Sequence, residues 1–130
     1  MLDTICDVLK EAYSRGWITT RDGNASLRRR SQQWMYITPS GARKQSLTSE
    51  QVLKLLFNSN PTDTTRPWTD MERADDEYQR RTIGWKPSGE LPMHYLLQTV
   101  SNTANRVVLH LHPTYTIADR KSTRLNSSHT

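Results

Sequence analysis

The stretch that decides the fold is Arg106-Val107-Val108-Leu109-His110-Leu111-His112-Pro113. Side chains alternate across a strand with a period of two, so an extended run places His110 and His112 on one face of an apolar strand. Their Cα atoms then lie roughly 7 Å apart, close enough for both rings to reach one ion at about 2.0 to 2.1 Å. The run therefore predicts half of a metal site.

A carboxylate, Glu90, stands upstream in Lys86-Pro87-Ser88-Gly89-Glu90, at the expected start of the helix that precedes this strand. Imidazole and carboxylate donors together suit a divalent transition ion, with zinc first. A hydrogen-bonded core or surface histidine is the competing interpretation of each imidazole. His94 lies four residues after Glu90 on the same helix face, and we expect it to make such a structural hydrogen bond rather than to bind metal.

Two further segments carry small, hydroxyl or amide residues beside a glycine, at the edges of short strand-like runs. They are Asp22-Gly23-Asn24-Ala25-Ser26-Leu27-Arg28 and Tyr36-Ile37-Thr38-Pro39-Ser40-Gly41. Backbone amides exposed at glycine, with Asn, Thr and Ser side chains beside them, make a donor-rich surface for phosphate or another oxyanion. The competing interpretation is that both segments are ordinary turns.

In chain order the four motifs are Gly-Asn-x-Ser-x-Arg, Thr-Pro-Ser-Gly, Lys-Pro-Ser-x-Glu and His-x-His-Pro. Together they resemble the class II aldolase/adducin family, whose members include the L-fuculose-phosphate and L-rhamnulose-phosphate aldolases. The resemblance covers about residues 2–118. It implies an α/β fold with a central, mainly antiparallel sheet flanked by helices, incomplete in this chain, and a homo-tetrameric parent protein.

The resemblance also implies roles for single residues. His110 and His112 resemble two of the three zinc-binding histidines, and Glu90 resembles the acid/base carboxylate beside the metal. Seven residues match the loops that hold the substrate phosphate: Gly23, Asn24, Thr38, Ser40, Gly41, Ser88 and Gly89. Many relatives have a second serine at the position of Gly89, so one hydroxyl is missing here.

The activity that the resemblance implies is metal-assisted aldol cleavage of a phosphorylated ketose, in which the ion stabilises the enediolate and Glu90 moves a proton. Sister enzymes of the same fold, pentulose-phosphate 4-epimerases and a methylthioribulose-phosphate dehydratase, are alternatives. Glu90 argues mildly against the epimerases, which usually have aspartate there. A non-enzymatic adducin-like scaffold is a third alternative, which the retained His110 and His112 disfavour.

Two departures from the family pattern concern the end of the chain. The third zinc histidine of the family lies well downstream, whereas the last histidine here, His129, stands in a polar stretch that does not resemble the family. We expect residues 1–118 to be the N-terminal part of the family domain and residues 119–130 to be a read-through tail. We therefore expect the chain by itself to be catalytically inactive.

Charge and composition argue against several classes of partner. The net charge is +5, but residues 120–130 supply three positive charges, so residues 1–119 carry 15 basic and 13 acidic side chains, a net charge of +2. We expect no nucleic-acid binding, because Arg28-Arg29-Arg30 fits a solvated turn and no extended basic stripe accompanies it. A single cysteine, no long apolar run and no leader pattern favour a reducing, cytoplasmic compartment without membrane contact.

Local patterns predict the remaining elements. Apolar residues recur at helical spacing from Leu2 to Tyr13 and the pattern stops at Gly16, which predicts a helix with a glycine cap and Cys6 in its buried face. We expect short strands at 17–19, 25–28 and 34–38. Thr48 and Gln51 have the spacing of a capping box, which predicts a short helix through Leu55. A polar excursion over 58–82, a helix from Ser88 to about Val100 and a further helix from Pro113 complete the expectation.

Overall fold

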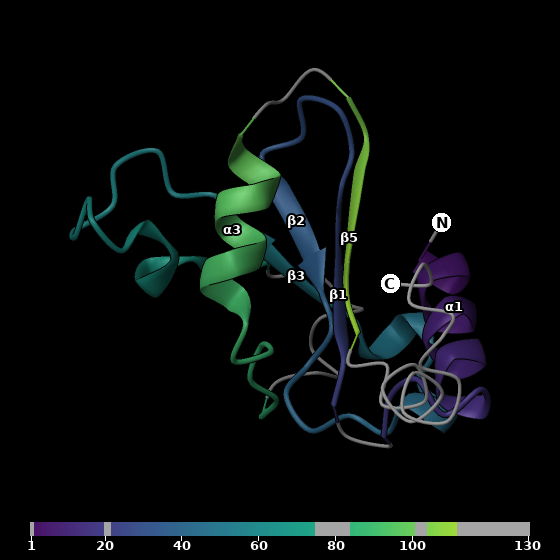
Figure 1. Ribbon diagram of the computed structural model, residues 1–130. Coiled ribbons are helices and arrows are strands. Elements are labelled where there is room, and N and C mark those ends of the chain that lie inside the picture. Colours follow the sequence, from purple (N-terminus) through teal and green to yellow (C-terminus); the bar gives the residue numbers. More distant parts are fainter. Residues whose placement is uncertain (1, 20–21, 75–83, 101–103, 112–130) are drawn as a thin grey trace, which may run out of the picture.

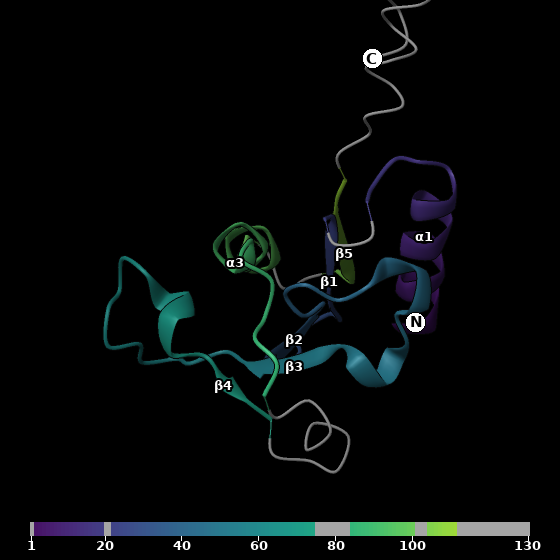
Figure 2. The ribbon, with the colours of Figure 1, turned by 90° about the horizontal axis from the view of Figure 1, so that it is seen from below.

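The computed structural model describes residues 2–19, 22–74, 84–100 and 104–111. Two α-helices lie on opposite sides of the same part of a sheet, as Figures 1 and 2 show: α1 (Leu2–Ser14) and α3 (Leu91–Thr99). The five strands have the order β4-β3-β2-β1-β5, and every pairing is antiparallel. They are β1 (Asn24–Arg28), β2 (Trp34–Ile37), β3 (Leu53–Leu56), β4 (Glu72–Arg73) and β5 (Arg106–His110). The expected α/β fold with an antiparallel sheet is confirmed.

Strand β1 lies between β2 and β5 in the sheet, and all five of its residues are buried. Its register with β5 runs from Asn24 opposite His110 to Arg28 opposite Arg106. Alternation gives β1 two different faces. Ala25 and Leu27 pack in the core cluster with α1, whereas the polar side chains of the opposite face lie under α3. The strand is therefore apolar towards one helix and polar towards the other.

Helix α1 covers the apolar face with Ile5, Cys6 and Leu9. Burial raises the pKa of the Cys6 thiol to about 11, with Asp3 as a smaller contributor, so Cys6 is an inert core residue, as expected. The helix ends at the predicted glycine. Gly16 has φ +74°, its N–H donates to Tyr13 and the N–H of Trp17 donates to Ala12, which is the hydrogen-bond pattern of a Schellman cap.

A polar layer fills the space between β1 and α3. His94 of α3 is fully buried, and its Nδ1 and Nε2 lie 2.6 Å from Ser26 Oγ and 2.5 Å from Asn24 Oδ1. Gln98, one turn further along α3, donates to Ser26 Oγ at 2.9 Å. The Arg28 guanidinium donates to the backbone carbonyl of Gln98 at 2.9 Å. Burying this many polar groups is tolerable because most of them bond to one another. Gln98 Oε1 is the exception in this layer, since it has no hydrogen-bond partner among the described residues.

Arg28 differs from the solvated residue that the sequence predicted. It is buried, and its guanidinium stacks 4.3 Å from the Phe57 ring centre. Burial lowers the pKa of Arg28 from its ordinary value. The first arginine of the basic triplet is therefore structural, which removes it from any nucleic-acid surface.

Two expected elements were wrong. Residues 17–19 form a bend rather than a strand, with Ile18 packed into the core. The capping box at Thr48 and Gln51 is present, but it opens only the 3-10 helix η2 (Ser49–Gln51). Leu53 and Leu55 then alternate with Lys54 in strand β3, which pairs with β2 and buries both leucines against Met35 and Ile37. Tertiary pairing overrides the local helix signal there.

The bounds of the other elements differ less from those expected. Helix α3 begins at Leu91 with Glu90 as its N-cap residue, two positions after the expected Ser88. The excursion after residue 57 contains the 3-10 helix η3 (Pro67–Asp70) and the short β4, while η1 (Lys44–Ser46) follows β2. The expected helix from Pro113 and the tail from 119 onwards lie outside the described residues. No helix among the described residues has the length and apolarity that a membrane crossing needs.

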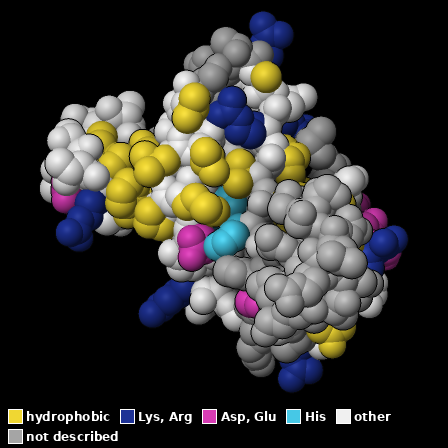
Figure 3. Space-filling model, viewed as in Figure 1, with side chains coloured by type: hydrophobic (Ala, Val, Ile, Leu, Met, Phe, Trp, Pro, Cys, Tyr) yellow, Lys and Arg dark blue, Asp and Glu magenta, His cyan; other side chains and the backbone are white. Residues whose placement is uncertain are grey.

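One face of the molecule retains large exposed apolar side chains, shown in Figure 3 as yellow atoms gathered across the middle of the view. Exposed apolar side chains on α3 and at its C-terminal end are Leu96, Leu97 and Val100. Val107 and Leu109 of β5 are also exposed, but they point to the α1 side of the sheet because they pair with Leu27 and Ala25. A helix with a free outer face normally carries polar residues there. This surface therefore has the composition of an interface rather than of a free exterior.

The buried imidazole predicts a pH-dependent stability. Burial, with a smaller effect of His110, lowers the pKa of His94 from 6.5 to about 4. Between these two values the unfolded chain binds the proton that the folded chain excludes, so the free energy of unfolding falls as pH drops from 6.5 towards 4 and is unaffected by His94 above that window. We expect a loss of about 2 to 3 kcal/mol. Urea unfolding across this range measures it. The variant His94→Gln, matched in polarity, should lack this component, and an identical pH dependence in both proteins would contradict the assignment.

Candidate functional site

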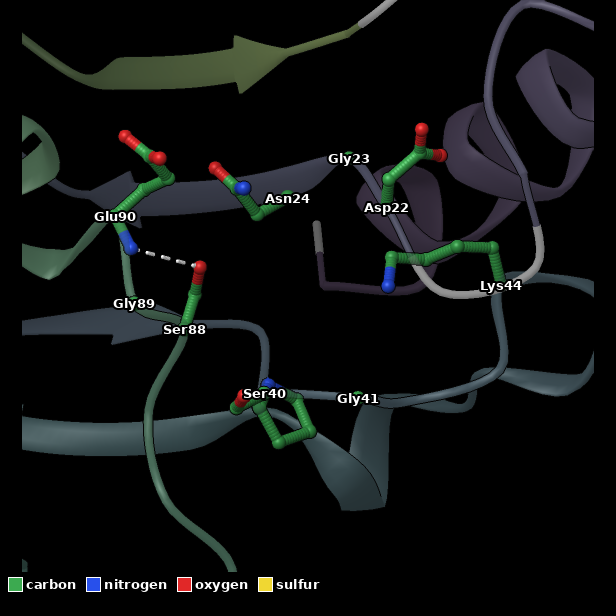
Figure 4. Close-up of a pocket in the computed structure, with 10 residues that line it drawn as sticks. Asp22, Gly23, Asn24, Ser40, Gly41, Lys44, Ser88, Gly89 and Glu90 are labelled. Carbon is green, nitrogen blue, oxygen red and sulfur yellow. Dashed lines mark hydrogen bonds between the residues drawn. The ribbon is translucent and has the colours of Figure 1, made fainter.

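A pocket of about 230 Å³ opens where β1 begins, beside the loop after β2 and the segment that leads into α3. Figure 4 shows side chains from all three segments around it. The lining residues are Asp22, Gly23, Asn24, Pro39, Ser40, Gly41, Lys44, Ser88, Gly89 and Glu90. Three motifs that are distant in the sequence thus meet at one concave surface.

Hydrogen bonds hold the three segments in register. The Thr38 N–H donates to the Ala25 carbonyl at 3.0 Å, and the Ala25 N–H donates back to Thr38 Oγ1 at 3.1 Å. The Ser40 N–H donates to the Lys86 carbonyl at 2.8 Å and the Ser88 N–H to the Thr38 carbonyl at 3.0 Å. The three segments are therefore held together mainly by backbone hydrogen bonds, with the Thr38 hydroxyl adding one more.

Glycine is required at one corner of this wall. Gly23 has φ +81°, and a Cβ at that position would lie 2.9 Å from Ile18 Cγ2. A side chain there would be strained by the left-handed backbone and would press on a core residue. Gly23 therefore lets the chain turn closely into β1, which brings Asn24 to the rim of the pocket.

The segment before α3 supplies the opposite wall. The Glu90 N–H donates to Ser88 Oγ at 3.2 Å, drawn as the dashed line in Figure 4, and the Leu91 N–H donates to the Ser88 carbonyl at 3.0 Å. Glu90 is then the N-cap residue of the helix, and its side chain stays 47% exposed. A partly solvated carboxylate at the edge of a pocket can exchange protons with a bound molecule.

Lys44 is a lining residue that the sequence did not predict. It is only 1% exposed, and its Nζ donates to the Ala42 carbonyl at 2.8 Å. Figure 4 shows the ammonium group turned towards the pocket from the side opposite Ser88. Asp22 lies nearby, with one carboxylate oxygen accepting from the Thr19 N–H. The available signal was the basic pair Arg43-Lys44 directly after the Thr-Pro-Ser-Gly motif.

The expected metal ligands are described only in part. His110 lies in β5 on the same side as α3, and its Nδ1 is 4.0 Å from Glu90 Oε2. This places the expected metal-binding imidazole beside the expected acid/base carboxylate. His112 lies outside the described residues, so its predicted position on the same face stays a prediction. Within the described ranges, no three His, Cys, Asp or Glu side chains form a cluster that could hold an ion.

The predicted site residues divide into three groups. Glu90 and six of the seven expected phosphate-loop residues line the pocket: Gly23, Asn24, Ser40, Gly41, Ser88 and Gly89. Thr38 does not line it, because its side chain is fully buried and bonded to the backbone of Ala25. His110 stands beside Glu90 at the edge. The roles of all these residues stay predictions.

Two curated proteins are similar to part of the chain. The methylthioribulose-1-phosphate dehydratase of Aspergillus niger is 32% identical over 89 residues, which are 68% of this chain and 32% of that protein. The enzyme of the same name from Aspergillus terreus is 30% identical over the same shares. The aligned part of the chain thus spans about a third of the length of these relatives.

A solved structure supports the fold. YgbL from Klebsiella pneumoniae, described as a candidate aldolase, epimerase or decarboxylase, superposes with a TM-score of 0.57 over 90% of this chain and 46% of that one, at 22% identity. The family model for the class II aldolase and adducin N-terminal domain matches residues 3–122. The match extends slightly beyond the boundary expected at 118, and that boundary stays a prediction. The chain therefore belongs to the class II aldolase and adducin N-terminal domain family.

Proposed function

We propose that this domain binds the phosphate of a phosphorylated ketose and supplies the acid/base carboxylate of a metal-dependent lyase. The observation that carries the proposal is the single pocket that joins Asn24, Ser40 and Lys44 to Glu90 at its edge. Its volume of about 230 Å³ is below the roughly 300 to 1,000 Å³ of pockets that enclose whole ligands. This size suits a phosphate group and the first carbon atoms of a sugar.

Charge and hydrogen-bond donors support a phosphate in particular. The Lys44 ammonium is fixed at the rim by the Ala42 carbonyl. Asn24 and Ser40 add polar groups, and glycine at 23, 41 and 89 leaves the backbone accessible. A buried cation beside neutral polar groups and accessible backbone is typical of a site for an oxyanion, and the two carboxylates of the lining, Asp22 and Glu90, complete its charges.

Glu90 is the proposed proton-transfer group. Aldol cleavage adds a proton at the carbon next to the ketone after the carbon–carbon bond breaks, whereas dehydration removes a proton from the corresponding carbon before water leaves. One carboxylate at the pocket edge can serve either reaction, because the two differ in the direction of proton transfer. A divalent ion held by His110 and the predicted His112, beside Glu90, would supply Lewis acidity towards the ketone oxygen.

Between the two lyase reactions, the similar proteins favour dehydration. Both Aspergillus relatives bear the name methylthioribulose-1-phosphate dehydratase. Aldol cleavage of a fuculose- or rhamnulose-type phosphate is the second candidate, supported by the order of the four motifs. Product analysis separates the two in the full-length protein, since dehydration yields one product of the same carbon count and cleavage yields two shorter fragments.

The proposed phosphate pocket predicts a specific role for Lys44. Replacing it by methionine keeps most of the side-chain volume but removes the charge, and we expect the affinity of the chain for inorganic phosphate to fall about 10- to 100-fold. Isothermal titration calorimetry measures this. Lys54→Met is the matched control, since Lys54 lies on β3 with its ammonium 4.5 Å from the Trp34 ring centre and does not line the pocket. Equal phosphate affinity in Lys44→Met and the unaltered chain would refute the assignment.

The proposed role of Glu90 predicts a loss of turnover without a loss of binding. In the full-length protein, Glu90→Gln should lower turnover of a ketose 1-phosphate by about 100-fold or more while phosphate affinity is retained. Steady-state kinetics with methylthioribulose 1-phosphate and with L-fuculose 1-phosphate checks this. Glu50→Gln removes a carboxylate of η2 that does not line the pocket, and it should leave turnover unchanged. Undiminished turnover in Glu90→Gln would exclude Glu90 from the mechanism.

A further inference from the structure

A continuous chain of hydrogen bonds links the edge strand β5 to the pocket through the polar layer. It starts at the backbone carbonyl of Arg106, which accepts from Gln98 Nε2 at 3.3 Å. Gln98 Nε2 also donates to Ser26 Oγ at 2.9 Å. From there the chain continues through His94 to Asn24. All three intermediate side chains are buried, so water does not interrupt it.

The first group in this chain fixes the direction of the rest. A carbonyl oxygen can only accept, so the Gln98 amide must present its nitrogen to Arg106 and thereby also to Ser26. Ser26 then accepts from Gln98 and has its own hydroxyl proton to give. Among the residues that the structure describes, the other hydrogen-bond partner of Ser26 Oγ is His94 Nδ1, 2.6 Å away, which therefore accepts.

The imidazole transmits this direction to the pocket. With Nδ1 accepting, a neutral ring carries its proton on Nε2 and donates to Asn24 Oδ1 at 2.5 Å. The low pKa of His94 agrees with a neutral ring. Asn24 thus turns its oxygen towards α3, as Figure 4 shows on the side of Glu90. Asn24 is only 7% exposed and lines the pocket. Among the described residues, its amide nitrogen has no hydrogen-bond partner.

We propose that Gln98, Ser26 and His94 act as positioning residues that lock the Asn24 amide with its N–H groups facing the pocket, ready to donate to a phosphate oxygen. This inference rests on the proposed function for the identity of the ligand. If hydrogen-bond donation ran the other way, the Asn24 amide would be turned around. A ring protonated on Nδ1 would accept at Nε2 from the Asn24 amide nitrogen, and the Asn24 oxygen would then face an oxyanion and repel it.

The imidazole tautomer reports the direction of the chain directly. In the 15N-labelled chain, long-range 1H–15N correlation of the His94 ring distinguishes a proton on Nε2 from one on Nδ1. We expect the Nε2–H form in the unaltered protein. Gln98→Glu, recorded at alkaline pH so that the buried carboxyl group is ionised, is the sharpest variant, because a carboxylate accepts only and Ser26 must then donate to it. The tautomer should change to Nδ1–H, since Ser26 now accepts from the ring.

A phosphate titration tests the consequence in the pocket. Gln98→Glu and Ser26→Ala touch no residue that lines the pocket except through His94, yet both should weaken inorganic phosphate binding about three- to tenfold. Thr99→Ala is the matched control. It removes a hydroxyl that donates to the Tyr95 carbonyl at 2.8 Å on the same helix, outside the chain of hydrogen bonds. This variant should change neither the His94 tautomer nor the phosphate affinity. Ser26→Ala serves if Gln98→Glu does not fold.

Three results would overturn the proposal: an Nδ1–H ring in the unaltered protein, an unchanged tautomer in Gln98→Glu, or unaltered phosphate affinity in both folded variants. The tautomer measurement and the phosphate titration also distinguish a failure of this proposal from a failure of the proposed function. If the unaltered chain does not bind phosphate, the phosphate pocket itself is wrong, whereas the tautomer still decides whether the hydrogen-bond chain has the inferred direction.

Discussion

The burial of β1 on both faces is the constraint on which the rest of the structure depends. Five residues lie between β2 and β5, and each must find its partner within the protein because none reaches solvent freely. Ala25 and Leu27 are satisfied by apolar contact with α1. Asn24, Ser26 and Arg28 require hydrogen bonds, since an unpaired polar group in this position costs roughly 1 to 3 kcal/mol. Helix α3 supplies those bonds, and so its position is set by polar as well as apolar groups.

This constraint connects the fold to the site. Asn24 begins β1 and lines the pocket, while Arg28 ends it under the C-terminal half of α3. His94 and Gln98 are one turn apart on α3, which matches the two-residue spacing of Asn24 and Ser26 along the strand. The same helix begins at Glu90, at the pocket edge. A shift of α3 would therefore alter the acid/base group and the phosphate-binding amide together.

Sequence patterns predicted the parts that depend on neighbouring residues. The helix ending at Gly16, the strands around Ala25 and Met35, and the strand leading to His110 all carry local periodicity or cap signals, and each is present. Most of the residues that the four motifs predicted for the phosphate site do line one pocket. Strand β3 was missed because the capping box at Thr48 is a local signal, whereas Leu53 and Leu55 are placed by pairing with β2.

Local patterns do not predict contacts between residues that are far apart in the sequence. The contact of His94 with Ser26 spans 68 residues, and nothing in either local sequence indicates which hydroxyl the ring meets. In the sequence, Lys44 resembles an ordinary surface lysine. In the structure, the turn after Gly41 buries it beside the pocket. The hydroxyl of Thr38, which lies in an expected binding segment, joins two backbone segments by accepting from the Ala25 N–H, and this long-range contact has no local signal either.

A crystal structure of the chain with inorganic phosphate tests most directly whether the polar face of β1 prepares an oxyanion site. We expect an anion in the pocket with one oxygen about 3 Å from Asn24 Nδ2 and another about 3 Å from Lys44 Nζ, and with Asn24 Oδ1 still hydrogen-bonded to His94. An anion bound elsewhere, or an Asn24 amide turned with its oxygen into the pocket, would contradict it.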